Sequence, residues 1–152
     1  MSLADRLSEL GIELPAVAAP VAAYVPAVVH SGLVHTSGQL PFVDGALPAT
    51  GKVGAGVDPE DAKGYARTCA LNALAAAADA AGGLERIGGV LRVGGFVASD
   101  PAFTGQPGVI NGASEVLGEI FGDAGRHARA AVGVPVLPLD SPVEVEVVFL
   151  LA

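Results

Sequence analysis

Apolar and polar residues alternate most regularly in residues 143–151, near the end of the chain. A period of two predicts a β-strand whose two faces meet different surroundings. One face is uniformly apolar and consists of Val143, Val145, Val147 and Phe149. The opposite face begins with Glu144 and Glu146. Shorter apolar runs bounded by turn residues predict four more strands, over residues 22–29, 33–37, 90–98 and 129–136.

Helical spacing of apolar residues predicts three helices, over residues 2–10, 58–81 and 108–121. The longest has the clearest ends: Asp58 can cap its first turn, Pro59 suits its first position, and Gly82 follows its last apolar residue. The shortest can be capped by Ser2.

The order of these elements predicts the fold class. Residues Ser31 and Gly32 form a two-residue turn, so the first two strands should make a hairpin. Helix, strand, helix, strand and strand follow, which indicates an α+β protein with a single mixed sheet and two helices on one face. Pro26 suggests an edge or a bulge in the first strand, and Gly94-Gly95 suggests a bulge in the third.

The second face of the sheet should also be covered, because Val148 and Leu150 follow the two glutamates on it. No further element is available, so we expect another copy of the chain to cover it, in a homo-oligomer. With 152 residues the chain is long enough for one domain. We divide it into an N-terminal extension with the short helix, residues 1–19, and the domain itself, residues 20–152.

Charge and cysteine content narrow the function. The net charge is −8 and no run of Lys or Arg occurs, which speaks against a nucleic-acid partner. The single cysteine, Cys69, excludes an intrachain disulfide and is best explained as a small buried side chain in an alanine-rich helix. Prolines interrupt the longest uncharged stretch, so we expect no membrane span and a cytoplasmic protein. The three histidines are not spaced as metal ligands, and we expect no metal.

Two charged residues in apolar strands are candidates for chemistry. Burial of Arg129 is costly unless the guanidinium meets an anion, and its planar fork fits a carboxylate. The alternative is an ion pair with a structural Glu of the same chain. Burial of Glu144 would raise its pKa and suit it to acid–base work or to positioning a water. The alternative is a solvent-facing residue of an alternating strand.

Several polar residues could complete a pocket. Ser37 and Gly38 follow the second strand, where the hydroxyl could bind a ligand or satisfy the turn and the glycine admits another backbone. Tyr24 could contribute its ring and hydroxyl. Asn111, near a helix start, could orient a ligand or cap the helix.

Taken in order, these pieces resemble the Rid family of reactive-intermediate deaminases, also called YjgF-like proteins. The resemblance runs from about residue 20 to residue 149. Its motifs are Tyr24-Val25 in the first strand, the run from Thr36 to Pro41, Gly95-Phe96-Val97, Asn111 opening the second large helix, Ala128-Arg129, Leu137-Pro138, and the run from Val143 to Glu146.

The resemblance implies a chorismate-mutase-like fold and a homotrimer with ligand clefts between subunits. It also implies hydrolysis of 2-aminoacrylate-like enamines and imines to 2-keto acids and ammonia, without a cofactor. Arg129 would bind the substrate carboxylate and Glu144 would hold the attacking water. Tyr24, Ser37, Gly38 and Asn111 would line the cleft.

The chain also departs from the family pattern. The helix at residues 2–10 is an addition, and Ala131 stands where the best-known deaminases have a cysteine. The main alternative function is a trimer that binds small carboxylates without turning them over. A ribonuclease is a third possibility, which the acidic charge balance disfavours.

Overall fold

The computed structural model describes residues 1–17 and 22–152. The boundary predicted between residues 19 and 20 lies outside these ranges. One five-stranded mixed sheet is present, in the order β1-β2-β5-β3-β4. Its strands are β1 (Ala27–His30), β2 (Leu33–Thr36), β3 (Ile87–Ala98), β4 (Ala128–Val134) and β5 (Val143–Leu151). Only the β3–β4 pair is parallel.

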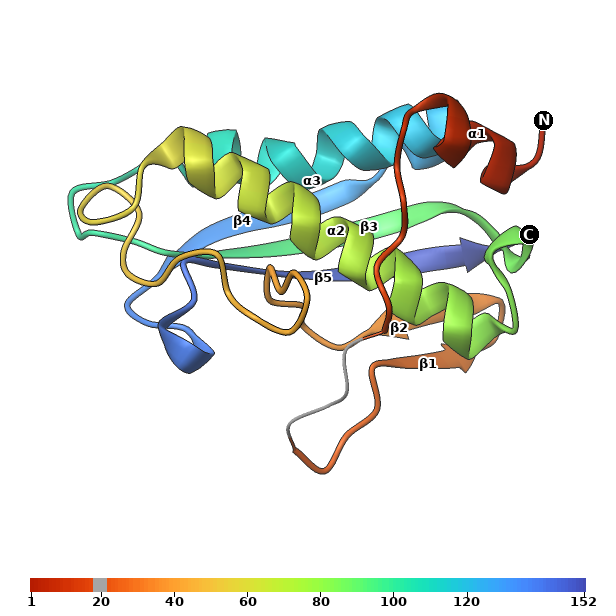
Figure 1. Ribbon diagram of the computed structural model, residues 1–152, viewed down its shortest axis with the longest axis horizontal. Coiled ribbons are helices and arrows are strands. Elements are labelled where there is room, and N and C mark those ends of the chain that lie inside the picture. The colour runs from red at the N-terminus through yellow and green to blue at the C-terminus, as the bar shows by residue number, and fades with distance from the viewer. Residues whose placement is uncertain (18–21) are drawn as a thin grey trace.

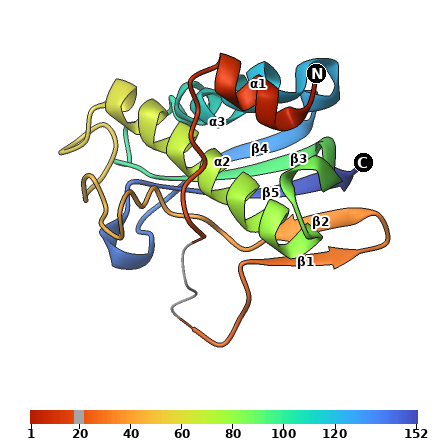
Figure 2. The same ribbon diagram turned by 45° about the vertical axis from the view of Figure 1, so that its right-hand side comes forward.

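Helices α2 and α3 lie side by side across one face of the sheet (Figure 1), as the second view confirms (Figure 2). The helices are α1 (Leu3–Glu9), α2 (Pro59–Ala81) and α3 (Gln106–Phe121). In the described part of the chain, short 3-10 helices occupy Leu84–Arg86, Gly122–Gly125 and Pro138–Asp140. The predicted α+β class, with a single mixed sheet and two helices on one face, is confirmed.

The sheet is built around β5, which pairs with β2 on one side and β3 on the other. Its four alternate apolar residues, from Val143 to Phe149, are buried under the helices. Glu144, Glu146 and Val148 are half-buried on the opposite face, which we call the open face. The alternation predicted from the sequence is therefore confirmed.

Glycine lets the two large helices approach closely. A side chain at Gly112 of α3 would overlap the carbonyl oxygen of Lys63 in α2. The small residues Ala62, Ala66 and Cys69 of α2 are all fully buried. The predicted ends of α2 are confirmed: the Asp58 side chain accepts from the backbone of Glu60, and Gly82 ends the helix in a left-handed conformation.

Three predicted details of the strands are wrong. The first strand begins at Ala27 and not at residue 22, so Tyr24 lies in a bend before it; Pro26, which has no N–H to donate, directly precedes the ladder. The irregularities of β3 fall between Ile87 and Gly89 and between Val90 and Arg92, and not at Gly94-Gly95.

The N-terminal helix α1 is attached to the domain by polar contacts at both ends. The Glu85 carboxylate accepts from the backbone N–H groups of Leu3 and Ala4, at 3.2 and 3.1 Å. The Arg6 side chain donates from Nε to the carbonyl oxygen of Glu119, at the end of α3. Leu7 is buried between these contacts. Within residues 1–17 and 22–152, no helix is long and apolar enough to cross a membrane.

Candidate functional site

The side chain of Arg129 lies at the edge of the sheet, against α3. Arg129 is opposite Val93 in the parallel β3–β4 pair, and Val93 is fully buried under the helices. Neighbouring residues in register share a face, so the arginine points to the helix-covered side. Its Nη1 donates to Oγ of Ser114 at 3.1 Å, and its Nη2 donates to the carbonyl oxygen of Pro107 at 3.0 Å. Helix α3 thus fixes the guanidinium.

Both partners of Arg129 are neutral. Among the residues that the structure describes, the ion pairs involve other cations: Arg6, Lys52, Lys63, Arg92 and Arg126. The alternative of an ion pair between Arg129 and a glutamate of its own chain is therefore wrong. A guanidinium has five N–H donors, and its two hydrogen bonds use two of them. A half-buried positive charge remains, with three donors for an acceptor from elsewhere.

Asn111 lies on the face of α3 that meets Arg129. It is the sixth residue of the helix, and Gly105 occupies the N-cap position, so the prediction that Asn111 opens or caps the helix is wrong. The positions of Pro107, Asn111 and Ser114 follow the i, i+4, i+7 spacing of one helical face. The half-buried amide is therefore on the same side of α3 as the two residues that hold the guanidinium.

Glu144 lies on the open face, opposite Phe96 of β3. Its side chain is half-buried against Gly38, where a Cβ atom would overlap Oε1 of the carboxylate. Gly38 has no positive φ, so the backbone does not require glycine there. Glycine is needed at this position because the Glu144 carboxylate occupies the space that a side chain would fill. Burial raises the pKa of the Glu144 carboxyl, and the negative charge of Glu146 raises it further.

Ser37 connects Gly38 with the segment that contains Tyr24. Its hydroxyl donates to the carbonyl oxygen of Val25 at 2.7 Å, and its backbone N–H donates to that of Pro26 at 2.8 Å. The hydroxyl oxygen can still accept a hydrogen bond. Tyr24 is 46% exposed. Ser37 and Gly38 therefore connect the chain segment that contains Tyr24 with Glu144.

The candidate residues thus form two groups that do not meet within one chain. Val93 and Phe96, which are opposite Arg129 and Glu144, are an odd number of positions apart on β3, so the two side chains point to opposite faces. Strand spacing and rise place their backbones roughly 14 Å apart. One group holds Arg129 and Asn111, and the other holds Glu144, Gly38, Ser37 and Tyr24.

The sequence analysis missed two residues beside Arg129. Ser114 contacts both Arg129 and His127: its Oγ is 2.8 Å from Nε2 of His127. The sequence contains only a weak signal for these contacts. His127 and Arg129 are two apart at the start of an extended segment, a spacing that places both side chains on one face. That this face meets Ser114 is a tertiary contact without a local signature.

Neither a reactive thiol nor a metal site is present in the described part of the chain. Burial raises the pKa of the Cys69 thiol far above its usual range, and the charge of Glu144 acts in the same direction. A neutral, buried thiol is unreactive, which agrees with the structural explanation of this residue. No group of three His, Cys, Asp or Glu side chains within residues 1–17 and 22–152 could hold a metal ion.

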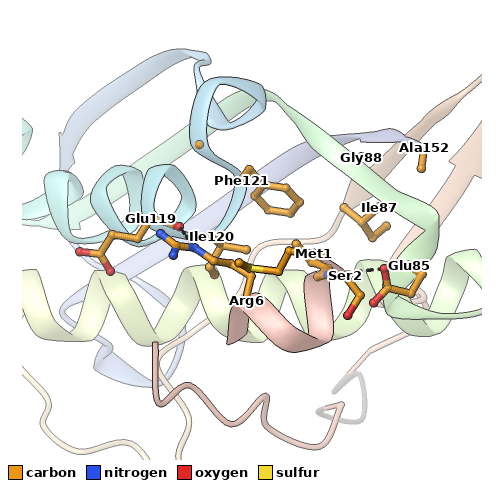
Figure 3. Close-up of a pocket in the computed structure, with 12 residues that line it drawn as sticks. Met1, Ser2, Arg6, Glu85, Ile87, Gly88, Glu119, Ile120, Phe121 and Ala152 are labelled. Atoms are coloured by element: carbon orange, nitrogen blue, oxygen red, sulfur yellow. Dashed lines mark hydrogen bonds between the residues drawn. The ribbon is translucent and has the colours of Figure 1, made fainter. Parts of the chain in front are cut away.

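A surface hollow of about 570 Å³ lies between α1, the end of α3 and the end of β5. Figure 3 shows Arg6 and Glu85 along its wall. Both polar groups are already used by the fold, since Glu85 accepts from the α1 backbone and Arg6 pairs with Glu9 and the Glu119 carbonyl. The hollow therefore marks where α1 packs on the domain.

The fold and Arg129 define a class of α+β protein. It has a mixed sheet with one open face, and an arginine at the edge of the sheet that can bind an anion. The chain matches the family described as "YjgF/chorismate_mutase-like, putative endoribonuclease" over residues 4–152, and it belongs to that family. Its fold is accordingly the chorismate-mutase-like fold. The match includes most of α1.

Three relatives illustrate the similarity. Protein TCP17 of Trypanosoma cruzi is 43% identical over 145 residues, which are 95% of this chain and 91% of the relative. The crystal structure of Atu1372 from Agrobacterium tumefaciens, a protein of unknown function, is 42% identical with a TM-score of 0.90, and covers 99% of this chain and 92% of that one. TdcF from E. coli, solved with bound serine, is 26% identical with a TM-score of 0.63, and covers 89% and 92%.

We predict that Gly38→Ala moves the Glu144 carboxylate while the fold survives, because the new methyl group takes the place of a flexible side-chain end. If Glu144 acts on the substrate, a displacement of about 1 Å costs on the order of a hundredfold in rate. Steady-state kinetics of the imine and enamine hydrolysis that the family resemblance implies, together with a melting curve, check this. Gly56→Ala is the matched control, since open space surrounds that position. Full activity in Gly38→Ala would contradict a role for this contact.

We predict that Glu144→Gln stabilises the protein at neutral pH. The pKa of this group is raised in the folded protein, so ionisation opposes folding once the pH exceeds the ordinary Glu value of about 4.3. The advantage of the variant should grow as the pH rises from there through the raised pKa, and then level off. It should stay below about 1 kcal/mol, because part of the side chain remains solvated.

Denaturant unfolding at several pH values measures this difference. Glu119→Gln, at an exposed position of α3 whose carboxylate takes part in none of the five ion pairs named above, is the control and should show no such growth. A variant that is less stable than the wild type at neutral pH would contradict the prediction.

Proposed function

We propose that this protein is a homotrimeric deaminase that hydrolyses 2-imino and 2-enamino acids, of the 2-aminoacrylate type, to 2-keto acids and ammonia. The observation on which this rests most is the half-buried Arg129, held by two neutral acceptors and without an anion in the described part of its own chain. A charge in such surroundings is stabilised by an anionic ligand.

A 2-imino acid supplies the anion. Its carboxylate can accept two parallel hydrogen bonds from the free side of the guanidinium, a geometry that lysine cannot reproduce. Such a contact fixes the C2–N bond relative to the protein, because the carboxylate is attached directly to C2. Asn111, on the same face of α3, supplies further polar groups beside it.

Glu144 then acts as the general base and the general acid of the reaction. The carboxylate takes a proton from a water molecule as the water oxygen bonds to C2 of the imine, and the C=N π electrons move to nitrogen. Glu144 returns this proton to the nitrogen, which gives a carbinolamine. It then moves the proton of the new hydroxyl to the amino nitrogen, so that the C=O bond forms as the C–N bond breaks and ammonia leaves. An enamine reacts as its imine tautomer. The raised pKa makes Glu144 a better base than an ordinary carboxylate near neutral pH. Water is the only co-reactant, so the proposal involves no cofactor.

The two groups of residues act together only if they come from two copies of the chain. Arg129 lies on the edge strand β4, which has an unpaired side in the monomer. The open face presents large apolar side chains that a lone chain would leave in water, among them Val28, Leu91 and Val132. A ring of three copies would cover this face and form three clefts, each with Arg129 from one subunit and Glu144 from the next.

The relatives support a small polar ligand. TdcF, which shares the fold, was solved with serine, an α-amino acid with the carboxylate that the proposal requires. The family description also names an endoribonuclease. A net charge of −8 does not favour RNA, whose binding needs a basic surface.

We predict that Arg129→Ala abolishes the activity. A dehydratase or an amino-acid oxidase generates the imine or enamine, and its disappearance is followed with and without this protein. Loss of one two-point contact should lower kcat/KM by on the order of a hundredfold or more. Arg126→Ala is the matched control, because this exposed arginine forms an ion pair with the equally exposed Asp123. Wild-type rates in Arg129→Ala would contradict the proposal.

Absence of any acceleration by the wild type would favour the alternative function, a trimer that binds carboxylates without turnover. That alternative needs Arg129 but not Glu144.

We predict that two inactive variants restore activity when combined. Arg129→Ala and Glu144→Ala subunits, unfolded together and refolded as mixed trimers, should recover about a quarter of the wild-type rate, because one cleft in four then pairs an intact Arg129 with an intact Glu144. Each variant refolded alone is the control. If the cleft lay within one chain, mixing would restore nothing.

A further inference from the structure

A chain of hydrogen bonds runs behind Arg129. Its Nη1 donates to Oγ of Ser114 at 3.1 Å, Oγ lies 2.8 Å from Nε2 of His127, and Nδ1 of His127 lies 2.6 Å from the carbonyl oxygen of Gly125. The four groups come from β4, from α3 and from the segment between them. Ser114 and His127 are half-buried, and neither is among the residues that the proposed reaction uses.

The direction of each bond follows from the backbone carbonyl. A carbonyl oxygen only accepts, so Nδ1 of His127 must bear the hydrogen. In the neutral ring Nε2 then has a free lone pair, and the Ser114 hydroxyl donates to it. The hydroxyl hydrogen is therefore turned away from Arg129, and the lone pairs of Oγ are available to its Nη1. Every link has one donor and one acceptor.

This arrangement holds the guanidinium without neutralising it. An arginine side chain has many rotamers, and fixing it during ligand binding costs affinity. A carboxylate in the place of Ser114 would also fix it, but would compete with the anionic ligand for its charge. Serine and the Pro107 carbonyl set the orientation and leave the positive charge for the ligand.

We propose that Ser114, oriented by His127, is a positioning residue that holds the Arg129 guanidinium ready to take a carboxylate. The inference rests on the proposed function, because it assumes that the ligand of Arg129 is a carboxylate. Loss of the Ser114 hydroxyl should weaken carboxylate binding about tenfold, the ordinary effect of losing one hydrogen bond to a charged group. It should raise KM more than it lowers kcat, since Ser114 does not touch the reacting atoms.

The experiment measures the affinity of the full-length protein for 2-ketobutyrate by calorimetry, together with its melting temperature and its elution volume. The variants are Ser114→Ala, Ser114→Thr and Arg129→Ala, and Ser8→Ala, on the exposed surface of α1, is the matched control. We expect about tenfold weaker binding in Ser114→Ala, rescue by the threonine hydroxyl, no binding in Arg129→Ala, and wild-type affinity in the control.

A second variant tests the chain from its other end and serves if Ser114→Ala does not fold. His127→Phe keeps a ring of similar size but cannot accept from the Ser114 hydroxyl, so the affinity should again fall several-fold.

The outcomes separate this inference from the proposed function. Wild-type affinity in Ser114→Ala and His127→Phe, with binding lost in Arg129→Ala, would overturn the positioning role and leave the carboxylate site standing. Affinity losses that follow the loss of melting temperature, without rescue by threonine, would also overturn it, because a structural role produces that pattern. If the wild type binds no 2-keto acid, or Arg129→Ala binds as well as the wild type, the carboxylate site is wrong and this inference falls with it.

Discussion

The structure depends on the alternation of side chains along β5. One set of residues, from Val143 to Phe149, is buried under α2 and α3 and forms the centre of the core. The other set places Glu144 and Glu146 on the open face. A shift of one residue in register would exchange the two sets, so burial of the apolar set also fixes the place of the carboxylates. The same pattern therefore specifies both the fold and half of the candidate site.

The charges of the two candidate residues are left uncompensated in different ways. Arg129 is surrounded by neutral acceptors that satisfy some of its N–H groups and leave its charge uncompensated. Glu144 is placed in surroundings that oppose its charge, through burial and through the neighbouring Glu146. The two opposite charges would stabilise each other if they were adjacent, but within one chain the sheet lies between them. In the proposed trimer, association of copies would bring the two charges into one cleft.

Local signals sufficed for much of this description. Asp58, Pro59 and Gly82 mark the ends of α2 through capping and backbone preference, and the alternation of β5 identifies its buried face. What failed depended on tertiary contacts. The β1–β2 ladder begins at Ala27, after Pro26, and the bulges of β3 follow its pairing with β5. Ser114 reaches Arg129 because a helix crosses the sheet edge, which no spacing in the sequence reveals.

The position of β5 within the sheet has a consequence for synthesis. It is made after every other strand, yet it lies between β2 and β3. Until the ribosome has made β5, the β1–β2 hairpin and the β3–β4 pair have no strand to join them, and α2 and α3 have no complete surface to cover. The core can therefore close only when β5 emerges, and the nascent chain must keep two strand edges from pairing elsewhere until then.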